Sequence, residues 1–293
     1  MQRLITILRL SRPLYLLLSA LTYVLGTGIA HYLGKSRAPT AFWLGLLGVL
    51  LALLAMSLLA EVFRPVNEPI VANETITDRR LTRDAALYVS IGALASLAVI
   101  AFLLYQDRLL GAPAFLFVAG SLFVLLIYSM PPFRLIDKGF GELLLSIQIA
   151  YLSPSIAYLL QAGTYHNLVV FISTPLVLLA LVMLLTLDFP SYTGDMKYER
   201  NTLLARLGWE RAIPFHHILV FGAYVFLAAA PLFGFSLRLL WPAFLSLPFG
   251  LLQIYWLRNI SLGAKPLWNL LTANAIAVFG LTAYLLTLTF WLR

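Results

Sequence analysis

The sequence has no cysteine and few charged residues. Without cysteine, the chain can form no disulfide bond, no thiolate metal site and no cysteine nucleophile. Only 11% of its 293 residues are Asp, Glu, Lys or Arg, whereas 61% are hydrophobic. A soluble core could not hide so much apolar surface, so the composition predicts a single integral membrane domain that spans residues 1–293.

Several familiar catalytic patterns are also missing. The sequence has no P-loop, no dinucleotide-binding glycine pattern, and no spacing that singles out a Ser-His-Asp triad. Charged residues are nearly absent from the long apolar segments. This argues against a transporter or channel, because an ion or proton path usually needs such residues. A transporter is therefore the least favoured function class.

The long apolar segments predict the fold. A transmembrane helix needs about twenty mainly apolar residues, and nine segments meet this criterion. We expect an all-α integral membrane protein, a bundle of about nine helices around a central cavity that cytoplasmic loops cap. The expected spans are roughly 14–33, 41–60, 86–105, 113–130, 141–162, 167–187, 212–232, 238–257 and 269–291.

The distribution of positive charge predicts the orientation of these spans. The N-terminus and the loops after the even-numbered spans share one side, and they hold fifteen of the 20 Lys and Arg residues. The positive-inside rule therefore predicts a cytoplasmic N-terminus and a C-terminus on the opposite side. The net charge of +8 reflects a basic surface beside anionic lipid and gives no support for nucleic-acid binding.

Two acidic stretches follow the second and sixth spans. AEVFRPVNEP places Glu61 and Glu68 seven residues apart, and LDFPSYTGDM places Asp188 and Asp195 at the same spacing. A seven-residue step returns to within about 20° of the same helix face, so each pair can point into a shared cavity. We expect these acids in two cytoplasmic loops, at about 61–85 and 188–211, and the repeated spacing suggests an internal duplication.

Basic residues accompany both acidic pairs. Carboxylates together with Lys and Arg suit a diphosphate held through Mg²⁺, because the carboxylates bind the cation and the basic groups bind phosphate oxygens. A solvated loop charge remains the alternative for any single one of them. The candidate diphosphate-binding residues are Arg64, Arg79, Arg134, Lys138, Lys197 and Arg200.

Three segments resemble a known family. DFPSYTGDMKYERNTLLARLG, at 188–208, resembles the second aspartate-rich motif of the UbiA superfamily of intramembrane prenyltransferases, especially its 1,4-dihydroxy-2-naphthoate polyprenyltransferase branch. IYSMPPFRLIDKGFGELLLSIQIAYLSPSIAYLLQAG, at 127–163, is similar to the Pro-Pro-Phe-Arg-Leu and Gly-x-Gly-Glu segment of that branch. LRLSRPLYLLLSALTYVLGTGIA, at 8–30, is similar to the family's Arg-Pro entry to the first helix.

The resemblance implies transfer of a prenyl group from a polyprenyl diphosphate to an acceptor, often an aromatic quinone precursor, inside the bilayer. It implies Mg²⁺ as cofactor and a dry cavity in which aromatic faces stabilise the allylic cation. The implied catalytic residues, which are also the metal ligands, are Glu61, Glu68, Asp188 and Asp195. The residues expected to line the substrate pocket are Asn67, Tyr128, Ser129 and Tyr192.

The sequence departs from the family pattern at one position in each motif. The family places acids at relative positions 0, 3 and 7, whereas this chain has Arg64 and Ser191 at the middle position. Two matching losses indicate altered metal binding. Two interpretations therefore remain open: an active prenyltransferase, and a relative of the same fold that binds isoprenoids without turning them over.

Overall fold

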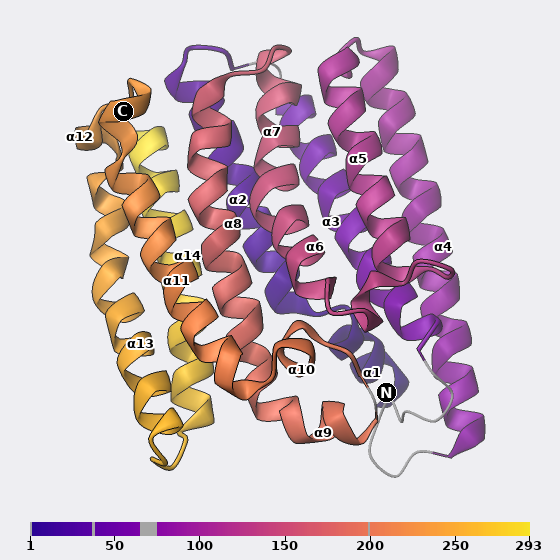
Figure 1. Ribbon diagram of the computed structural model, residues 1–293. Coiled ribbons are helices and arrows are strands. Elements are labelled where there is room, and N and C mark those ends of the chain that lie inside the picture. The colour runs from indigo at the N-terminus through magenta and orange to yellow at the C-terminus, as the bar shows by residue number, and fades with distance from the viewer. Residues whose placement is uncertain (1, 37–38, 65–74, 199) are drawn as a thin grey trace.

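The structure is a computed structural model that describes residues 2–36, 39–64, 75–198 and 200–293 (Figure 1). In these ranges the regular structure is helical, which confirms the predicted all-α class. The elements are α1 (Gln2–Leu10), α2 (Pro13–Tyr32), α3 (Pro39–Val62), α4 (Ile76–Gln106), α5 (Ala112–Ser129), η1 (Leu135–Asp137), α6 (Gly141–Ile147), η2 (Gln148–Leu152), α7 (Ser153–Ala162), α8 (Asn167–Asp188), η3 (Phe189–Ser191), α9 (Tyr192–Lys197), α10 (Leu203–Leu207), α11 (Trp209–Ala228), η4 (Ala230–Phe233), α12 (Leu237–Leu240), η5 (Trp241–Ser246), α13 (Leu247–Ser261) and α14 (Trp268–Leu292).

Nine helical segments in the described residues are long and apolar enough to cross a membrane, as predicted. Several of them combine consecutive elements of the chain. They are Pro13–Tyr32, Pro39–Val62, Ile76–Gln106, Ala112–Ser129, Gly141–Ala162, Asn167–Lys197, Trp209–Ala228, Leu237–Ser261 and Trp268–Leu292.

The two acidic loops are shorter than the sequence predicts, because helices extend into both. Helix α4 already begins at Ile76, where the Thr75 side chain accepts a hydrogen bond from the Asp78 backbone N–H and caps the helix. Helix α8 runs to Asp188 and continues through η3 and α9 to Lys197. Hydropathy marks where the apolar surface ends, whereas the backbone remains helical beyond that point.

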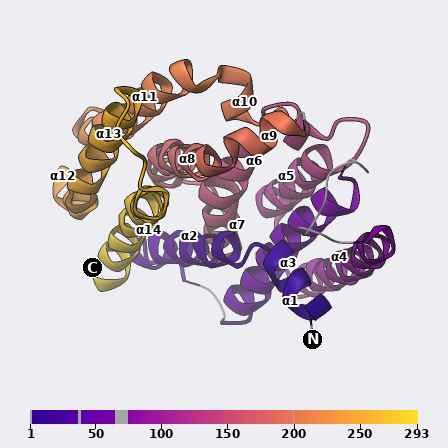
Figure 2. The ribbon, with the colours of Figure 1, turned by 90° about the horizontal axis from the view of Figure 1, so that it is seen from below.

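The most buried part of the bundle consists of α6, η2, α7 and α8. Seen along the bundle, these helices lie inside a surround that includes α2, α3, α5, α11 and α14 (Figure 2). Helix α4 lies at the periphery (Figure 2), and its Tyr88 and Phe102 side chains are exposed. Apolar side chains on such a face are expected where a helix meets lipid.

Helices α2 and α7 approach closely at a proline. A Cβ atom at Gly26 would overlap the Pro154 carbonyl oxygen, so glycine permits this approach. Pro154 cannot donate to the helical ladder, and the turn before it is the π-helix η2. Within this turn the Ile149 carbonyl accepts a hydrogen bond of 2.6 Å from Thr22 Oγ1. Such bonds between helices satisfy backbone groups that water cannot reach.

Both the N-terminus and the polar connections lie at one end of the bundle, which we call the charged end; it carries α1, η1, α9 and α10 (Figure 1). The C-terminus lies at the opposite end. At the charged end, segments 134–142 and 200–207 join to form what we call the cover. Lys138 forms an isolated bridge with Asn201, and Arg206 Nη1 donates to the Lys138 carbonyl at 3.2 Å. The Arg206 guanidinium also lies 4.9 Å from the Phe140 ring centroid.

Candidate functional site

A polar cavity of about 140 Å³ lies at the charged end, and residues of the cover form part of its wall. The other wall residues come from the start of α2, the end of α5, the rest of α6, and the α8–η3–α9 segment. Carboxyl, guanidinium and phenol groups therefore meet where the apolar core ends. The polar side chains that line it are Arg12, Tyr15, Tyr128, Glu142, Asp188, Ser191, Asp195, Arg200 and Thr202.

Asp188 and Asp195 line this cavity together, from opposite ends of the η3–α9 segment. Asp195 is buried, and Arg200 Nη1 lies 3.6 Å from its Oδ1 atom. The Arg200 backbone N–H also donates to the Asp195 carbonyl at 2.9 Å. Ser191 Oγ donates to Asp195 Oδ2 at 3.2 Å. The second acidic stretch thus presents two carboxyl groups and one guanidinium to the same space.

Arg12 joins the first acidic stretch to this cavity. Its Nη2 atom lies 3.4 Å from Glu61 Oε1, and its Nη1 atom donates to Tyr128 Oη at 3.4 Å. Burial alone would lower the pKa of Arg12, but the surrounding tyrosine and carboxyl groups, Glu61 and Asp188 among them, raise its pKa above the ordinary arginine value. The guanidinium therefore remains charged at the cavity wall.

Glu61 is buried at the end of α3 and interacts with two guanidinium groups. Besides Arg12, Arg64 Nη1 lies 2.9 Å from Glu61 Oε2. Two guanidinium groups, one on each carboxyl oxygen, hold the Glu61 side chain in place. The arginine at the position of the first missing acid therefore pairs with the acid that opens the motif.

Comparison with known proteins identifies the family. A model of the UbiA prenyltransferase family matches residues 69–275, which is more than half of the chain. The chain belongs to this family. No curated protein matches it. The family-level resemblance is thus confirmed, while the dihydroxynaphthoate branch stays a prediction.

Solved structures of a UbiA homologue from Archaeoglobus fulgidus share the fold. The structure of that homologue bound to DMAPP and Mg²⁺ has a TM-score of 0.64 at 17% identity and covers 98% of each chain. Its structure bound to GPP and Mg²⁺ has a TM-score of 0.64 at 18% identity, again over 98% of each chain. A further structure has a TM-score of 0.62 at 19% identity, over 97% of this chain and 99% of the other. The helical bundle is therefore a UbiA-type fold.

Five of the six predicted basic residues of this UbiA-family chain do not line the polar cavity, and three of the five lie on the surface or in a separate groove. Lys197 is exposed and lies 5.5 Å from the Tyr198 ring centroid. Lys138 is exposed on the cover and its Nζ atom donates to the Pro132 carbonyl at 3.4 Å. Arg79 lines a separate surface groove beside α4. Their assignment to the diphosphate site stays a prediction, which the lining of this cavity does not support.

Three further predicted residues have structural partners instead. Arg134 donates from Nη1 to the Ala60 carbonyl at 3.0 Å and pairs with Asp137, so it supports the cover. Ser129 is buried, and its hydroxyl bonds back to its own helix. The Tyr192 ring packs against Trp209 at 5.9 Å.

The two remaining predicted residues, Asn67 and Glu68, lie outside the described residues. Sequence reasoning gave no role to Arg12, Tyr15 or Glu142, although all three line the cavity. Arg12 and Glu142 do belong to the segments that carry the family resemblance, in the Arg-Pro and Gly-x-Gly-Glu patterns. These patterns were the signal that could have identified them.

The cavity residues fit a Mg²⁺ ion that binds together with a diphosphate. Two buried carboxyl oxygens at the cavity, Asp188 Oδ2 and Glu142 Oε2, have no hydrogen-bond partner in the described part of the chain. Among the described residues, no three acidic or histidine side chains are placed to hold a metal ion by themselves. Mg²⁺ commonly uses one or two carboxylates, and waters and substrate phosphate oxygens complete its octahedron.

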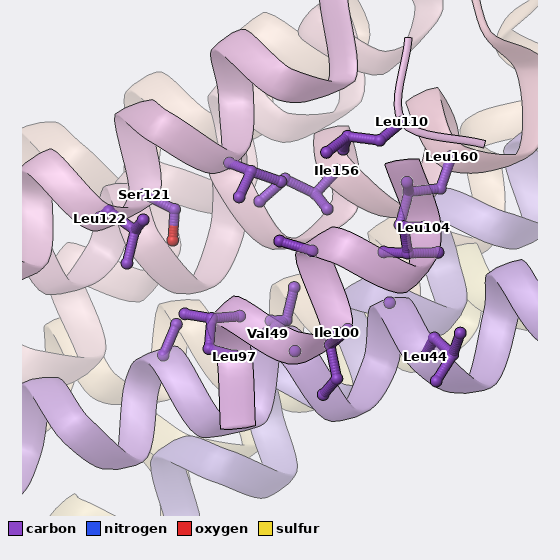
Figure 3. Close-up of a pocket in the computed structure, with 15 residues that line it drawn as sticks. Leu44, Val49, Leu97, Ile100, Leu104, Leu110, Ser121, Leu122, Ile156 and Leu160 are labelled. Atoms are coloured by element: carbon purple, nitrogen blue, oxygen red, sulfur yellow. The ribbon is translucent and has the colours of Figure 1, made fainter. Parts of the chain in front are cut away.

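A second, smaller cavity of about 30 Å³ lies deeper in the bundle, between α3, α4, α5 and α7 (Figure 3). Ser121 is the one side chain with a polar group among the residues that line it. Val49, Leu97, Leu122 and Ile156 give it apolar walls. Tyr128 of the polar cavity and Ser121 of the apolar one lie seven residues apart on α5, which corresponds to about 10 Å along the helix.

Proposed function

We propose that the protein transfers a prenyl group from a polyprenyl diphosphate to an acceptor within the membrane. The observation that carries this proposal is the polar cavity, where two arginines and several carboxyl groups meet at the end of an apolar bundle of the UbiA type. The A. fulgidus homologue of the same fold binds DMAPP or GPP with Mg²⁺. A charged diphosphate joined to an apolar chain requires these two environments side by side.

Several polar groups of the cavity have a role in the proposed reaction. Asp188 and Asp195 would hold Mg²⁺, which neutralises charge on the diphosphate when bound. Arg12 and Arg200 face the same space and would bind phosphate oxygens, so that negative charge is stabilised as the C–O bond breaks. The Tyr128 ring would face the allylic cation and stabilise it electrostatically. Glu61 would act through Arg12 by holding its guanidinium in place.

The isoprenoid tail would leave the polar cavity towards the apolar interior. Small side chains in α3, including Gly48 and Ala52, line the deeper apolar cavity. At its present volume that cavity does not hold a long chain, so a tail would enter it by displacing side chains such as Leu97. Rates with donors of different isoprenoid length therefore measure which tails the protein accepts.

The proposed acceptor class rests on the resemblance of two sequence segments to one branch of the family. Residues 127–163 and 188–208 resemble the dihydroxynaphthoate polyprenyltransferase branch, and on this ground we propose an aromatic, quinone-precursor-like acceptor. The alternative function is an isoprenoid-binding relative without turnover. Arg64 and Ser191, which replace the middle acids of both motifs, are the observation that favours this alternative.

Diphosphate release tests the proposal. Purified protein in nanodiscs receives labelled geranyl, farnesyl, geranylgeranyl or longer diphosphates, with and without Mg²⁺, and a panel of aromatic and lipid acceptors. We expect release that requires both acceptor and Mg²⁺ and that falls about 100-fold or more in Asp188→Asn and Asp195→Asn. Asp107 is an exposed acid at the C-terminal end of α4. Asp107→Asn is therefore the matched control, and we expect it to keep the wild-type rate.

Two outcomes would contradict the proposed transfer. Tight binding of every diphosphate without release under any condition would support the isoprenoid-binding alternative. Release that the two aspartate variants leave unchanged would place the chemistry outside the polar cavity.

A further inference from the structure

We propose that Glu142 is a further carboxylate that, beside Asp188, holds Mg²⁺ against the diphosphate. This inference rests on the proposed function and deepens it. Glu142 belongs to neither acidic stretch, because it is the second residue of α6. It would supply from a third element the carboxylate that neither Arg64 nor Ser191 provides.

Only one oxygen of the buried Glu142 carboxyl group accepts a hydrogen bond from a donor group in the described residues. The residue is 9% exposed and lines the polar cavity. One carboxyl oxygen, Oε1, accepts a hydrogen bond of 3.0 Å from the Leu203 backbone N–H at the start of α10. The other oxygen, Oε2, is buried and has no hydrogen-bond partner in the described residues. One oxygen of the carboxyl group is thus anchored to the cover, while the side chain also interacts with Asp188 across the cavity.

Asp188 shows the same feature on the facing wall. Its Oδ2 atom is buried, and no donor group of the part of the chain that the structure describes bonds to it. The Asp188 and Glu142 carboxyl groups both line the cavity and interact electrostatically. Two buried carboxyl groups this close repel each other when both are ionised, unless a proton or a cation lies between them.

The arginines at this end of the bundle pair with other acids. Glu61 has Arg12 and Arg64 within salt-bridge distance, and Asp195 has Arg200. The structure gives no salt bridge between a described residue and Glu142 or Asp188. The pair therefore consists of two acids that line one cavity and interact with each other, with no salt-bridge partner among the described residues. A hard divalent cation, which uses two carboxylates and completes its shell with water and phosphate oxygens, fits such a pair.

The positions of the missing middle acids explain why a third element is needed. Arg64 pairs with Glu61 and Ser191 bonds to Asp195, so both replacements stabilise the neighbouring motif acids. Neither side chain offers a carboxyl oxygen to a metal. Glu142 lines the same cavity as Asp188 and Asp195, and the Leu203 N–H of the cover bonds to it there.

The test uses Glu142→Gln, which keeps an acceptor oxygen for the Leu203 N–H and removes the negative charge. Binding of labelled farnesyl S-thiolodiphosphate, an analogue that resists ionisation, is measured in nanodiscs while Mg²⁺ is titrated. We expect the Mg²⁺ concentration for half-maximal binding to rise about tenfold or more, with binding restored at saturating Mg²⁺. Glu210→Gln, an exposed acid in the first turn of α11, is the matched control and titrates like the wild type.

The variants separate this inference from the proposed function. If Asp188→Asn weakens Mg²⁺-dependent binding but Glu142→Gln titrates like the wild type, Glu142 is not a ligand while the proposed function stands. If Glu142→Gln and Glu142→Ala lose binding equally at every Mg²⁺ concentration, Glu142 only anchors the cover and the inference fails. If the wild-type protein binds the analogue without any Mg²⁺ dependence, the metal role assigned under the proposed function fails as well.

Discussion

Arg12 lines the polar cavity, although the sequence gave it no role. Its guanidinium contacts Glu61 and Tyr128 and lies 5.7 Å from the Tyr15 ring centroid. Its backbone has a φ of 50°, in the left-handed region, directly before Pro13 starts α2. Non-glycine residues in this region are uncommon and concentrate at functional sites. The local strain at Arg12 is consistent with a residue that the site fixes in place.

Replacing Arg12 tests this role at the scale of one side chain. Arg12→Lys keeps a positive charge but loses the planar fork that reaches two partners at once. We expect the KM for the prenyl diphosphate to rise about tenfold or more, and kinetics of diphosphate release measure it. Arg9→Lys, an exposed residue of α1, is the control. An unchanged KM in both variants would mean that Arg12 makes no contact with the diphosphate.

Some cavity residues were predictable from the sequence and others were not. Asp188 and Asp195 reach one cavity, as the seven-residue spacing predicts. Lys197 points elsewhere because it follows Asp195 by two positions, about 200° around the helix. Tyr192 is drawn to Trp209 by aromatic packing, which no spacing rule contains. Glu142 was missed because an isolated acid beside glycines carries no periodic signal.

At the scale of elements, the cover determines how the cavity is closed. Its two segments are about 60 residues apart in the sequence and meet through Lys138, Asn201 and Arg206. A Cβ atom at Gly139, whose φ is 75°, would lie 2.9 Å from Arg206 Cδ. The glycine therefore lets the arginine side chain lie across the segment. The sequence identified both segments by resemblance, but their contact depends on tertiary structure.

Removing the Arg206 side chain tests the role of the cover. Arg206→Ala removes the hydrogen bond to the Lys138 carbonyl and the contact with Phe140. Because Arg206 is exposed, we expect a modest effect, a two- to fivefold rise in KM at roughly unchanged kcat. Arg211→Ala, also exposed and nearby in the chain, is the control and keeps the wild-type KM. Equal kinetics for Arg206→Ala and the wild type would show that the cover does not depend on this side chain.

At the scale of the whole molecule, the sequence predicted the number and order of the spans. Each span needs only a long apolar run, which is a local property. The extension of α4 to Ile76 and of α8 through α9 was missed, because capping and tertiary contacts hold these charged ends helical. The cytoplasmic orientation of the charged end and the single-domain organisation stay predictions.

The central claim is that the polar cavity holds a prenyl diphosphate together with a divalent cation. A structure of the protein with Mn²⁺ in place of Mg²⁺ and geranyl S-thiolodiphosphate tests it most directly, since anomalous scattering locates the metal. The account predicts Mn²⁺ bonded to Asp188 and to the diphosphate, with Arg12 and Arg200 on phosphate oxygens. Metal and diphosphate bound elsewhere, for example at the surface groove beside Arg79 and Arg80, would contradict it.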